Sequence, residues 1–131
     1  MPRIGQIGIR CRDLEKSVRF YRDILGLEEY ARLESADHHR IVALRGGPVE
    51  LELIATDPKE KPLEVEGRAG LNHFAFYVRN LDEMLNELRK KGVKILGEPR
   101  DFSKDIRTAF FEDPDGVRVE LVQFSGERAR K

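Results

Sequence analysis

The sequence predicts an α+β fold built from two repeated β-α-β-β-β modules. Alternating apolar runs, typical of strands, surround two amphipathic segments that are typical of helices. The same order of elements occurs twice along the chain. With a shift of 67 positions, residues 6–22 align with residues 73–89, so that Arg12 meets Arg79 and Leu14 meets Leu81. The matching helix starts and apolar stripes favour an internal duplication over chance.

Both helices carry start and stop signals. The first, over residues 13–26, begins at Asp13 as N-cap and ends at Gly26, which can adopt the left-handed conformation. Its apolar stripe consists of Leu14, Val18, Tyr21 and Leu25. The second helix, over residues 80–92, begins at Asn80 and ends at Gly92. Its stripe consists of Leu81, Leu85 and Leu88.

Each helix follows one strand and precedes three more. The preceding strands lie in "QIGIRC" and in "GLNHFAFYV". The following strands are expected near residues 28–34, 39–45 and 49–56 in the first half, and near 93–97, 106–112 and 117–124 in the second. "RGGP" and "DPDG" supply the turns before the last strand of each half.

These elements predict one domain over residues 1–131. Module one covers about 3–56, a charged linker with Pro and Gly covers about 57–69, and module two covers about 70–124. A charged C-terminal tail follows at 125–131.

Composition excludes several classes of partner. The 24 basic and 24 acidic residues give a net charge of zero, so nothing favours nucleic acid or an anionic membrane. No apolar run approaches the roughly 20 residues of a membrane helix, and the start "MPRIGQIG" lacks a signal-peptide core. The one cysteine, Cys11, excludes an internal disulfide and is typical of a reducing compartment. A cytoplasmic protein is expected.

The repeat brings four metal-competent side chains to equivalent positions. His73 aligns with Gln6, and the shared "EL" of the last strands aligns Glu52 with Glu120, with one extra residue in the intervening loops. Strand alternation puts all four on the face away from the helices. A lone strand histidine is most often a packed core residue, but the matched set favours metal binding. One imidazole, one amide oxygen and two carboxylates suit Zn²⁺ or Ni²⁺, and also Co²⁺, Mn²⁺ or Fe²⁺.

The chain also resembles a known family. The duplication, the helix "DLEKSVRFYRDILGL" and the ending "EDPDGVRVELV" are similar to the vicinal oxygen chelate superfamily over roughly residues 3–124. Its members include glyoxalase I, methylmalonyl-CoA epimerase, fosfomycin-resistance thiol transferases, extradiol dioxygenases and bleomycin-binding proteins. The resemblance implies a cupped eight-stranded mixed sheet around a metal site.

Within this family the ligand set resembles that of glyoxalase I. Gln6, Glu52, His73 and Glu120 fall on its four ligand positions, in the combination of the animal-type enzyme. Extradiol dioxygenases and fosfomycin transferases use two histidines and a glutamate. Methylmalonyl-CoA epimerases usually carry histidine first and glutamine second. Bleomycin-binding members lack the set, which counts against a non-catalytic antibiotic-binding or resistance protein.

Other residues favour the epimerase alternative or leave the co-substrate open. "GRAGLNHFAF" is similar to an epimerase stretch in which a second histidine stands at the place of Asn72. Arg10 matches an arginine that binds a glutathione carboxylate in glyoxalase I, whereas Thr56 and Ala69 replace two other glutathione contacts. Lys104, in a loop before the seventh strand, is a second candidate for substrate binding. Arg10 and Lys104 also have the simpler interpretation of solvated surface cations.

The expected reaction is a proton abstraction next to a metal-polarised carbonyl, through an enediolate. By resemblance, Glu120 is the first candidate for the base and Glu52 the second. The substrate would be the adduct of a 2-oxoaldehyde and a thiol, or an acyl-CoA. The family implies a homodimer, in which the four ligands come from one chain or from two.

Overall fold

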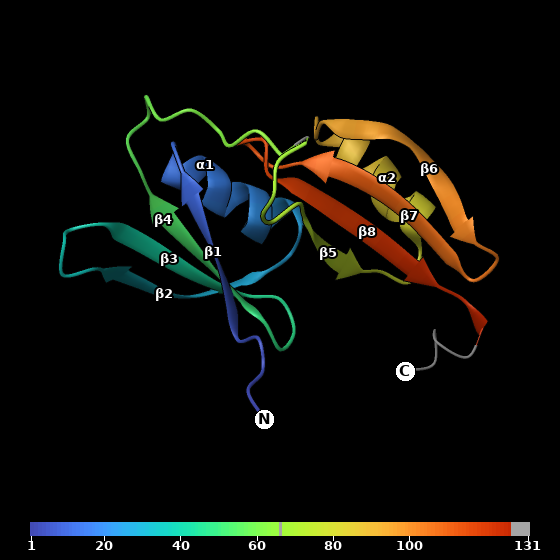
Figure 1. Cartoon of the computed structure of the whole chain (residues 1–131), viewed down its shortest axis with the longest axis horizontal. Coiled ribbons are helices and arrows are strands. Elements are labelled where there is room, and N and C mark those ends of the chain that lie inside the picture. The colour runs from blue at the N-terminus through green and yellow to red at the C-terminus, as the bar shows by residue number, and fades with distance from the viewer. Residues whose placement is uncertain (66, 127–131) are drawn as a thin grey trace. The chain divides into compact units, whose positions relative to one another are not determined.

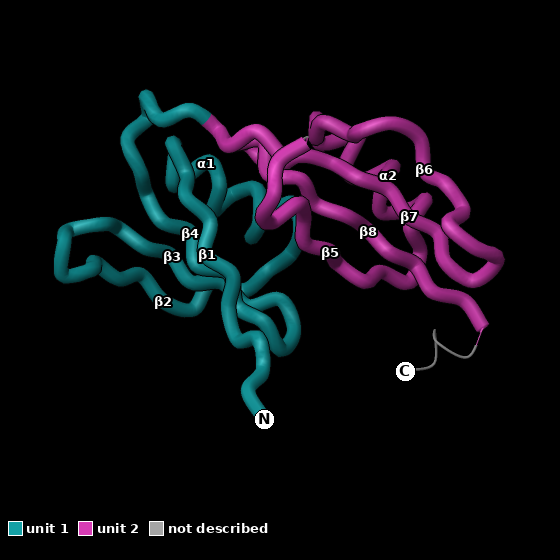
Figure 2. The backbone as a smooth tube through the Cα atoms, in the orientation of Figure 1, with its two compact units in different colours: residues 1–61 teal, residues 62–131 magenta. Residues whose placement is uncertain are grey.

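The computed structural model describes residues 1–65 and 67–126. Most of the charged tail predicted at 125–131 therefore lies outside the described residues. The chain divides into two compact units, unit 1 over Met1–Lys61 and unit 2 over Pro62–Lys131 (Figure 2). The division falls within the predicted linker 57–69.

Both units have the order β-α-β-β-β (Figure 1). In unit 1 the elements are β1 (Gln6–Cys11), α1 (Leu14–Val18), the π-helical turn η1 (Arg19–Ile24), β2 (Glu28–Glu34), β3 (Arg40–Arg45) and β4 (Glu50–Ala55). In unit 2 they are β5 (Phe74–Tyr77), α2 (Leu81–Lys90), β6 (Ile95–Ser103), β7 (Ile106–Glu112) and β8 (Arg118–Phe124). The predicted α+β fold of two modules is confirmed.

Hydrogen bonds join the strands into two four-stranded sheets, with the orders β1-β4-β3-β2 and β5-β8-β7-β6. The first and last strands of each unit pair in parallel, and the other pairs are antiparallel. The structure thus has one four-stranded mixed sheet in each unit. The family resemblance had implied a single eight-stranded sheet around a metal. None of the helices in the described ranges is long and apolar enough to span a bilayer.

The helix starts agree with the sequence. The backbone N–H of Lys16 donates to Asp13 Oδ1 at 3.1 Å, and the N–H of Glu83 donates to Asn80 Oδ1 at 3.0 Å. Each cap satisfies one of the amide groups that a helix leaves without an internal partner at its N-terminus. Gly26 and Gly92 have φ angles of 81° and 77° where the helical segments end, as expected for left-handed terminators.

The second half of the first helix departs from the regular spacing. Over η1 the turn widens, and Leu25 N donates to Phe20 O, five residues earlier, at 3.1 Å. The wider turn buries Phe20 beside Tyr21, whereas Leu25, predicted in the apolar stripe, stays half-buried. A regular period of 3.6 residues does not anticipate such an inserted turn.

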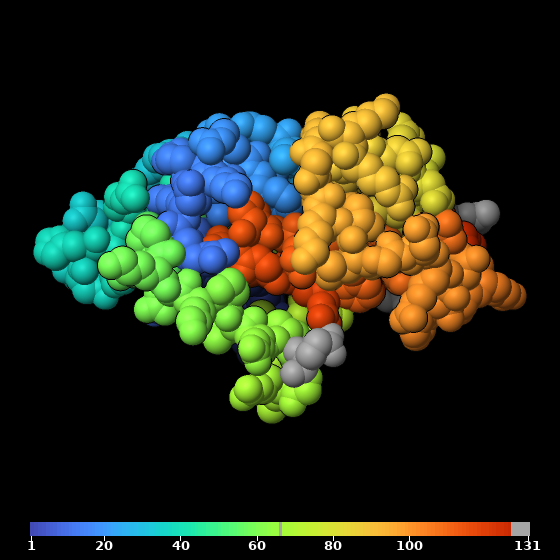
Figure 3. Space-filling view, turned by 90° about the horizontal axis from the view of Figure 1, so that it is seen from above, coloured from blue at the N-terminus to red at the C-terminus, as the bar shows by residue number. Residues whose placement is uncertain are grey.

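Strand β6 is longer than predicted. The sequence predicts a strand near 93–97, but β6 continues to Ser103 through two irregularities in its pairing with β7. Pro99 is tolerated because β6 is an edge strand, whose outer side needs no backbone donor. Gly97, with φ of 75°, lies at the first irregularity. Figure 3 shows the β6–β7 hairpin projecting from unit 2 (orange).

Each sheet buries the face that its helix covers. In unit 1 the side chains of Cys11, Val18, Tyr21, Leu44 and Leu53 are fully buried. The corresponding core of unit 2 consists of Leu81, Leu85, Leu88, Phe111, Val119 and Leu121. Burying side chains of this kind contributes about 1.5–3 kcal/mol each. Strand alternation directs the intervening side chains to the opposite face, where the candidate site residues lie.

We expect the N-cap of α2 to contribute measurably to stability. Asn80→Ala removes the acceptor for the Glu83 amide and should lower the free energy of unfolding by about 1 kcal/mol in urea denaturation. The matched control is Asn86→Ala, an exposed position within the same helix, where alanine is a better helix former and no loss is expected. Equal losses for the two variants would contradict the capping role.

Candidate functional site

In unit 1 the parallel ladder between β1 and β4 places Gln6 near two carboxylates. Gln6 is the register partner of Glu50, and Gly8 is the partner of Glu52. Ile9 and Cys11 are buried against the helix side, whereas Gln6 and Arg10 are exposed on the other face. Glu50 and Glu52 alternate with the buried Leu51 and Leu53, so they share the face of Gln6.

In unit 2 the equivalent ladder brings together His73 and Glu120. Ala75 in β5 is the register partner of Glu120 in β8, and His73 comes one residue before β5. His73 Nε2 lies 3.4 Å from Glu120 Oε1, with side chains 35% and 17% exposed. Both groups are therefore ordered by the sheet and still accessible from solvent.

The two ladders have the same register. Gly8 pairs with Glu52 as Ala75 pairs with Glu120, and on the other side Ala43 pairs with Glu52 as Phe110 pairs with Glu120. The extra residue that the alignment requires lies in the turn before the last strand, which covers 46–49 in unit 1 and 113–117 in unit 2. Glu52 and Glu120 thus occupy equivalent register positions in the two sheets.

Two neighbours hold the His73 ring. Its Nδ1 lies 2.7 Å from Asn72 Oδ1, and its plane packs edge-to-face on Phe110, with ring centroids 5.3 Å apart. An amide oxygen and a carboxylate both only accept, and the amide oxygen of Asn72 is the nearer of the two, so the geometry favours the tautomer with the proton on Nδ1. The lone pair of a neutral ring is then on Nε2, the nitrogen that faces Glu120.

This pair fits two ligands of one divalent ion. Two donors about 2.1 Å from one ion and about 110° apart lie about 3.4 Å from each other. The observed separation of Nε2 and Oε1 is 3.4 Å. Among the described residues, no group of three or more His, Cys, Asp or Glu side chains could hold an ion. The pair is therefore a partial ligand set, which needs further oxygen donors.

Glu50 differs from Glu52 although both lie on the same face of β4. The Tyr30 hydroxyl donates to Glu50 Oε2, and Arg45 Nε lies 3.9 Å from Glu50 Oε1. The Arg45 guanidinium also stacks 4.0 Å above the Tyr30 ring. In the part of the chain that the structure describes, the Gln6 and Glu52 side chains make no such hydrogen bond or ion pair. Of the two carboxylates of β4, Glu52 is therefore the one that remains available to a ligand.

Sequence reasoning missed this Tyr30–Glu50–Arg45 cluster. Tyr30 has the same parity on β2 as Glu28, whose register partner Arg45 is also the partner of Glu50, so alternation is consistent with a shared face. The contact joins β2 to β4 across β3, and the pattern of a single strand does not give the order of strands in the sheet. The sequence does indicate the position of Glu50, because alternation along the strand places it on the same face as Glu52.

The two predicted substrate contacts lie in different settings. Arg10 is exposed on β1 on the face of Gln6, as the alternation predicts. Lys104 is exposed in a two-residue turn between β6 and β7. The loop expected before the seventh strand is thus a tight hairpin, because β6 extends further than predicted.

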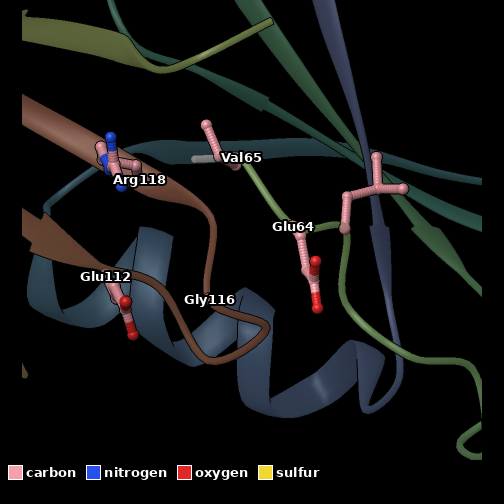
Figure 4. A pocket seen from close by; sticks show the side chains of 6 residues that line it. Glu64, Val65, Glu112, Gly116 and Arg118 are labelled. Carbon is pink, nitrogen blue, oxygen red and sulfur yellow. The ribbon is translucent and has the colours of Figure 1, made fainter. Parts of the chain in front are cut away.

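A small pocket of unit 2 lies beside the start of β8 (Figure 4). Its volume is about 270 Å³, and it is lined by Leu63, Glu64, Val65, Glu112, Gly116 and Arg118. Arg118 and Glu120 alternate with the buried Val119, so Arg118 shares the face of the His73–Glu120 pair. The charged lining suits a small polar group better than an apolar ligand.

Comparison with known proteins assigns the family. Residues 3–121 match the model of the Glyoxalase/Bleomycin resistance protein/Dioxygenase superfamily. An uncharacterized protein of Bacillus subtilis, YwkD, is 37% identical over 92% of this chain and 95% of its own length. Human mitochondrial methylmalonyl-CoA epimerase is 27% identical over 94% of this chain and 74% of its own length. The solved structure of trypanothione-dependent glyoxalase I from Leishmania major is 29% identical, covers 94% of this chain and 87% of its own, and has a TM-score of 0.75.

We expect Tyr30 to ionise at higher pH than a free tyrosine. The hydrogen bond to the Glu50 carboxylate, more than any other cause, raises the pKa of Tyr30 above its ordinary value of about 10. Because the folded pKa is the higher one, the stability from this bond is present below about pH 10 and is lost as the pH rises through the folded value. The tyrosine ring NMR signals, followed against pH, measure the shift.

Glu50→Gln removes the charge and should lower the pKa of Tyr30 toward the ordinary value. The charge-matched control is Glu60→Gln, an exposed position in the same unit that should leave the titration unchanged. An unchanged titration in Glu50→Gln would show that the carboxylate is not the cause.

Proposed function

Because the chain belongs to the glyoxalase/bleomycin resistance protein/dioxygenase superfamily, we propose that it is a metal-dependent lyase or isomerase of the glyoxalase I type. The observation that carries the proposal is the pair of His73 Nε2 and Glu120 Oε1, 3.4 Å apart. A neutral imidazole with its proton on Nδ1 presents a lone pair to a carboxylate oxygen. Two electron-rich atoms at this distance favour a positive charge between them.

The proposed ligands are Gln6, Glu52, His73 and Glu120. Two carboxylates would neutralise a divalent ion, while the amide and the imidazole complete a nitrogen and oxygen set that suits Zn²⁺ or Ni²⁺. The equal registers of the two ladders support the set, because each gives one carboxylate on its central last strand and one neutral donor at the start of the first strand.

The bound ion would supply positive charge that stabilises negative charge developing on substrate oxygen atoms. Glu120 is the proposed base, since its carboxylate is held on β8 and yet reaches solvent. It would take a proton from the carbon next to the substrate carbonyl and return it to the neighbouring carbon. Glu52 is the second candidate for this role, and Arg10, exposed on the face of Gln6, is the proposed anchor for an anionic part of the substrate.

The second candidate function is epimerisation of a methylmalonyl-CoA-like substrate. The similarity of "GRAGLNHFAF" to an epimerase stretch and the relationship to human methylmalonyl-CoA epimerase favour it. The chemistry differs only in that the proton returns to the same carbon from the opposite side. The ligand set favours the glyoxalase reaction over this one.

We expect the protein purified without chelator to hold about one divalent ion per four-ligand set. With Co²⁺ as the probe, Glu52→Gln and Glu120→Gln should each weaken binding by more than about 100-fold, because losing even an outer partner of a ligand costs 10–100-fold. Glu50→Gln is the matched control and should change the affinity far less than either ligand variant, since Glu50 is engaged by Tyr30 and Arg45. Absence of metal from the wild-type protein would contradict the proposal and favour a non-catalytic binding protein.

The substrate is tested by proton exchange in D₂O. Hemithioacetals of methylglyoxal with several thiols are compared with methylmalonyl-CoA, and turnover of a hemithioacetal is expected. Glu120→Gln should lower kcat by about 10²–10⁴-fold, the range for loss of a general base. Turnover of methylmalonyl-CoA alone would establish the epimerase alternative, and turnover of neither substrate would overturn both reactions.

A further inference from the structure

Asn72 makes the shortest contact of the His73 ring. Its side-chain oxygen lies 2.7 Å from Nδ1, while the other ring nitrogen lies 3.4 Å from the Glu120 carboxylate. Asn72 is exposed and precedes β5, so neither the core nor the strand ladder requires an amide there. The contact is therefore not explained by packing of the sheet.

The ring has two tautomers with opposite consequences. With the proton on Nδ1, the lone pair lies on Nε2 and can bind an ion beside Glu120. With the proton on Nε2, the ring donates to Glu120, and its lone pair points toward Asn72. Asn72 Oδ1 and the Glu120 carboxylate can both only accept a hydrogen bond, and the contact with Asn72 is the shorter, 2.7 Å against 3.4 Å, so the geometry favours the first tautomer.

The orientation of the ring is fixed as well. Phe110 packs edge-to-face on the imidazole, with an interplanar angle of 87°. Phe110 is also the register partner of Glu120 in the neighbouring strand β7. The ring is thus held on one nitrogen by Asn72 and on its plane by Phe110, and its remaining nitrogen is directed to the carboxylate.

We propose that Asn72 is a positioning residue that selects the Nδ1–H tautomer of His73 and thereby makes Nε2 a metal ligand. The inference deepens the proposed function and rests on its metal site. Asn72 would touch neither the ion nor the substrate and would act through His73 alone. An outer partner of this kind typically changes metal affinity by 10–100-fold.

The tautomer can be measured in the metal-free protein. The chain has 3 histidines, so nitrogen–carbon correlation NMR of the imidazole rings at alkaline pH gives few signals, and His73→Gln assigns the one of interest. Wild type should show the Nδ1–H form. Asn72→Leu keeps the size of the side chain but removes the acceptor, and should shift His73 toward the Nε2–H form. Asn72→Asp keeps an acceptor oxygen and should restore the Nδ1–H form.

The same variants are then titrated with Co²⁺. Asn72→Leu should bind about 10–100-fold more weakly than wild type, and Asn72→Asp should bind at least as well as wild type. Leu71→Ala is the control, since Leu71 is the adjacent exposed side chain and should change neither readout. The His38 and His39 signals, which come from unit 1, should stay in place and serve as internal references for the shift of the His73 signal.

Two results overturn the inference by itself. One is an Nε2–H tautomer in the wild-type protein. The other is an Asn72→Leu variant that keeps the wild-type tautomer or the wild-type Co²⁺ affinity. A wild-type protein that shows the Nδ1–H form but binds no Co²⁺ instead overturns the proposed metal site, and the positioning role falls with it.

Discussion

The parallel pairing of the first and last strands in each unit is the constraint on which the rest of the site depends. In a strand, successive side chains point to opposite faces, so a slip of one residue would move every site residue under the helix. The register is fixed because Leu51, Leu53, Val119 and Leu121 must be buried. Burial of one face therefore positions Glu52 and Glu120 on the other. The candidate ligands are placed by the hydrophobic core, not by contacts of their own.

Much of the fold could be predicted because its signals are local and periodic. The caps at Asp13 and Asn80 and the alternation of each last strand are all present in single short segments. What could not be predicted depends on insertions that break the period. At the widened turn of η1, Phe20 is buried in place of the predicted Leu25. Strand β6 continues beyond Pro99 through irregular pairing with β7. No local pattern distinguishes an edge strand with a bulge from a loop that contains proline.

The sequence predicts which sheet face each site residue occupies, but it does not predict the partners of its side chain. Parity places Gln6 and Glu52 on one sheet face and His73 and Glu120 on another, and the alignment of the repeats matches the pairs. The partners of these residues lie beyond such reasoning. Asn72 is a sequence neighbour of His73, but only the ring geometry shows that it reaches Nδ1. Tyr30 on β2 reaches Glu50 on β4 across β3, and the pattern of a single strand does not give the order of strands in the sheet.

The two units carry opposite charges at the position next to their candidate carboxylate ligand. In unit 1 the register pair beside the candidate ligands is Arg45 and Glu50, and the equivalent pair of unit 2 has its charges exchanged, as Glu112 and Arg118. The position before Glu52 on its face therefore carries a carboxylate, which Tyr30 and Arg45 engage, whereas the position before Glu120 carries a guanidinium. In both units a cation therefore lies near the carboxylate, so neither Glu52 nor Glu120 has excess negative charge beside it. Two such carboxylates would balance the charge of one divalent ion in the proposed site.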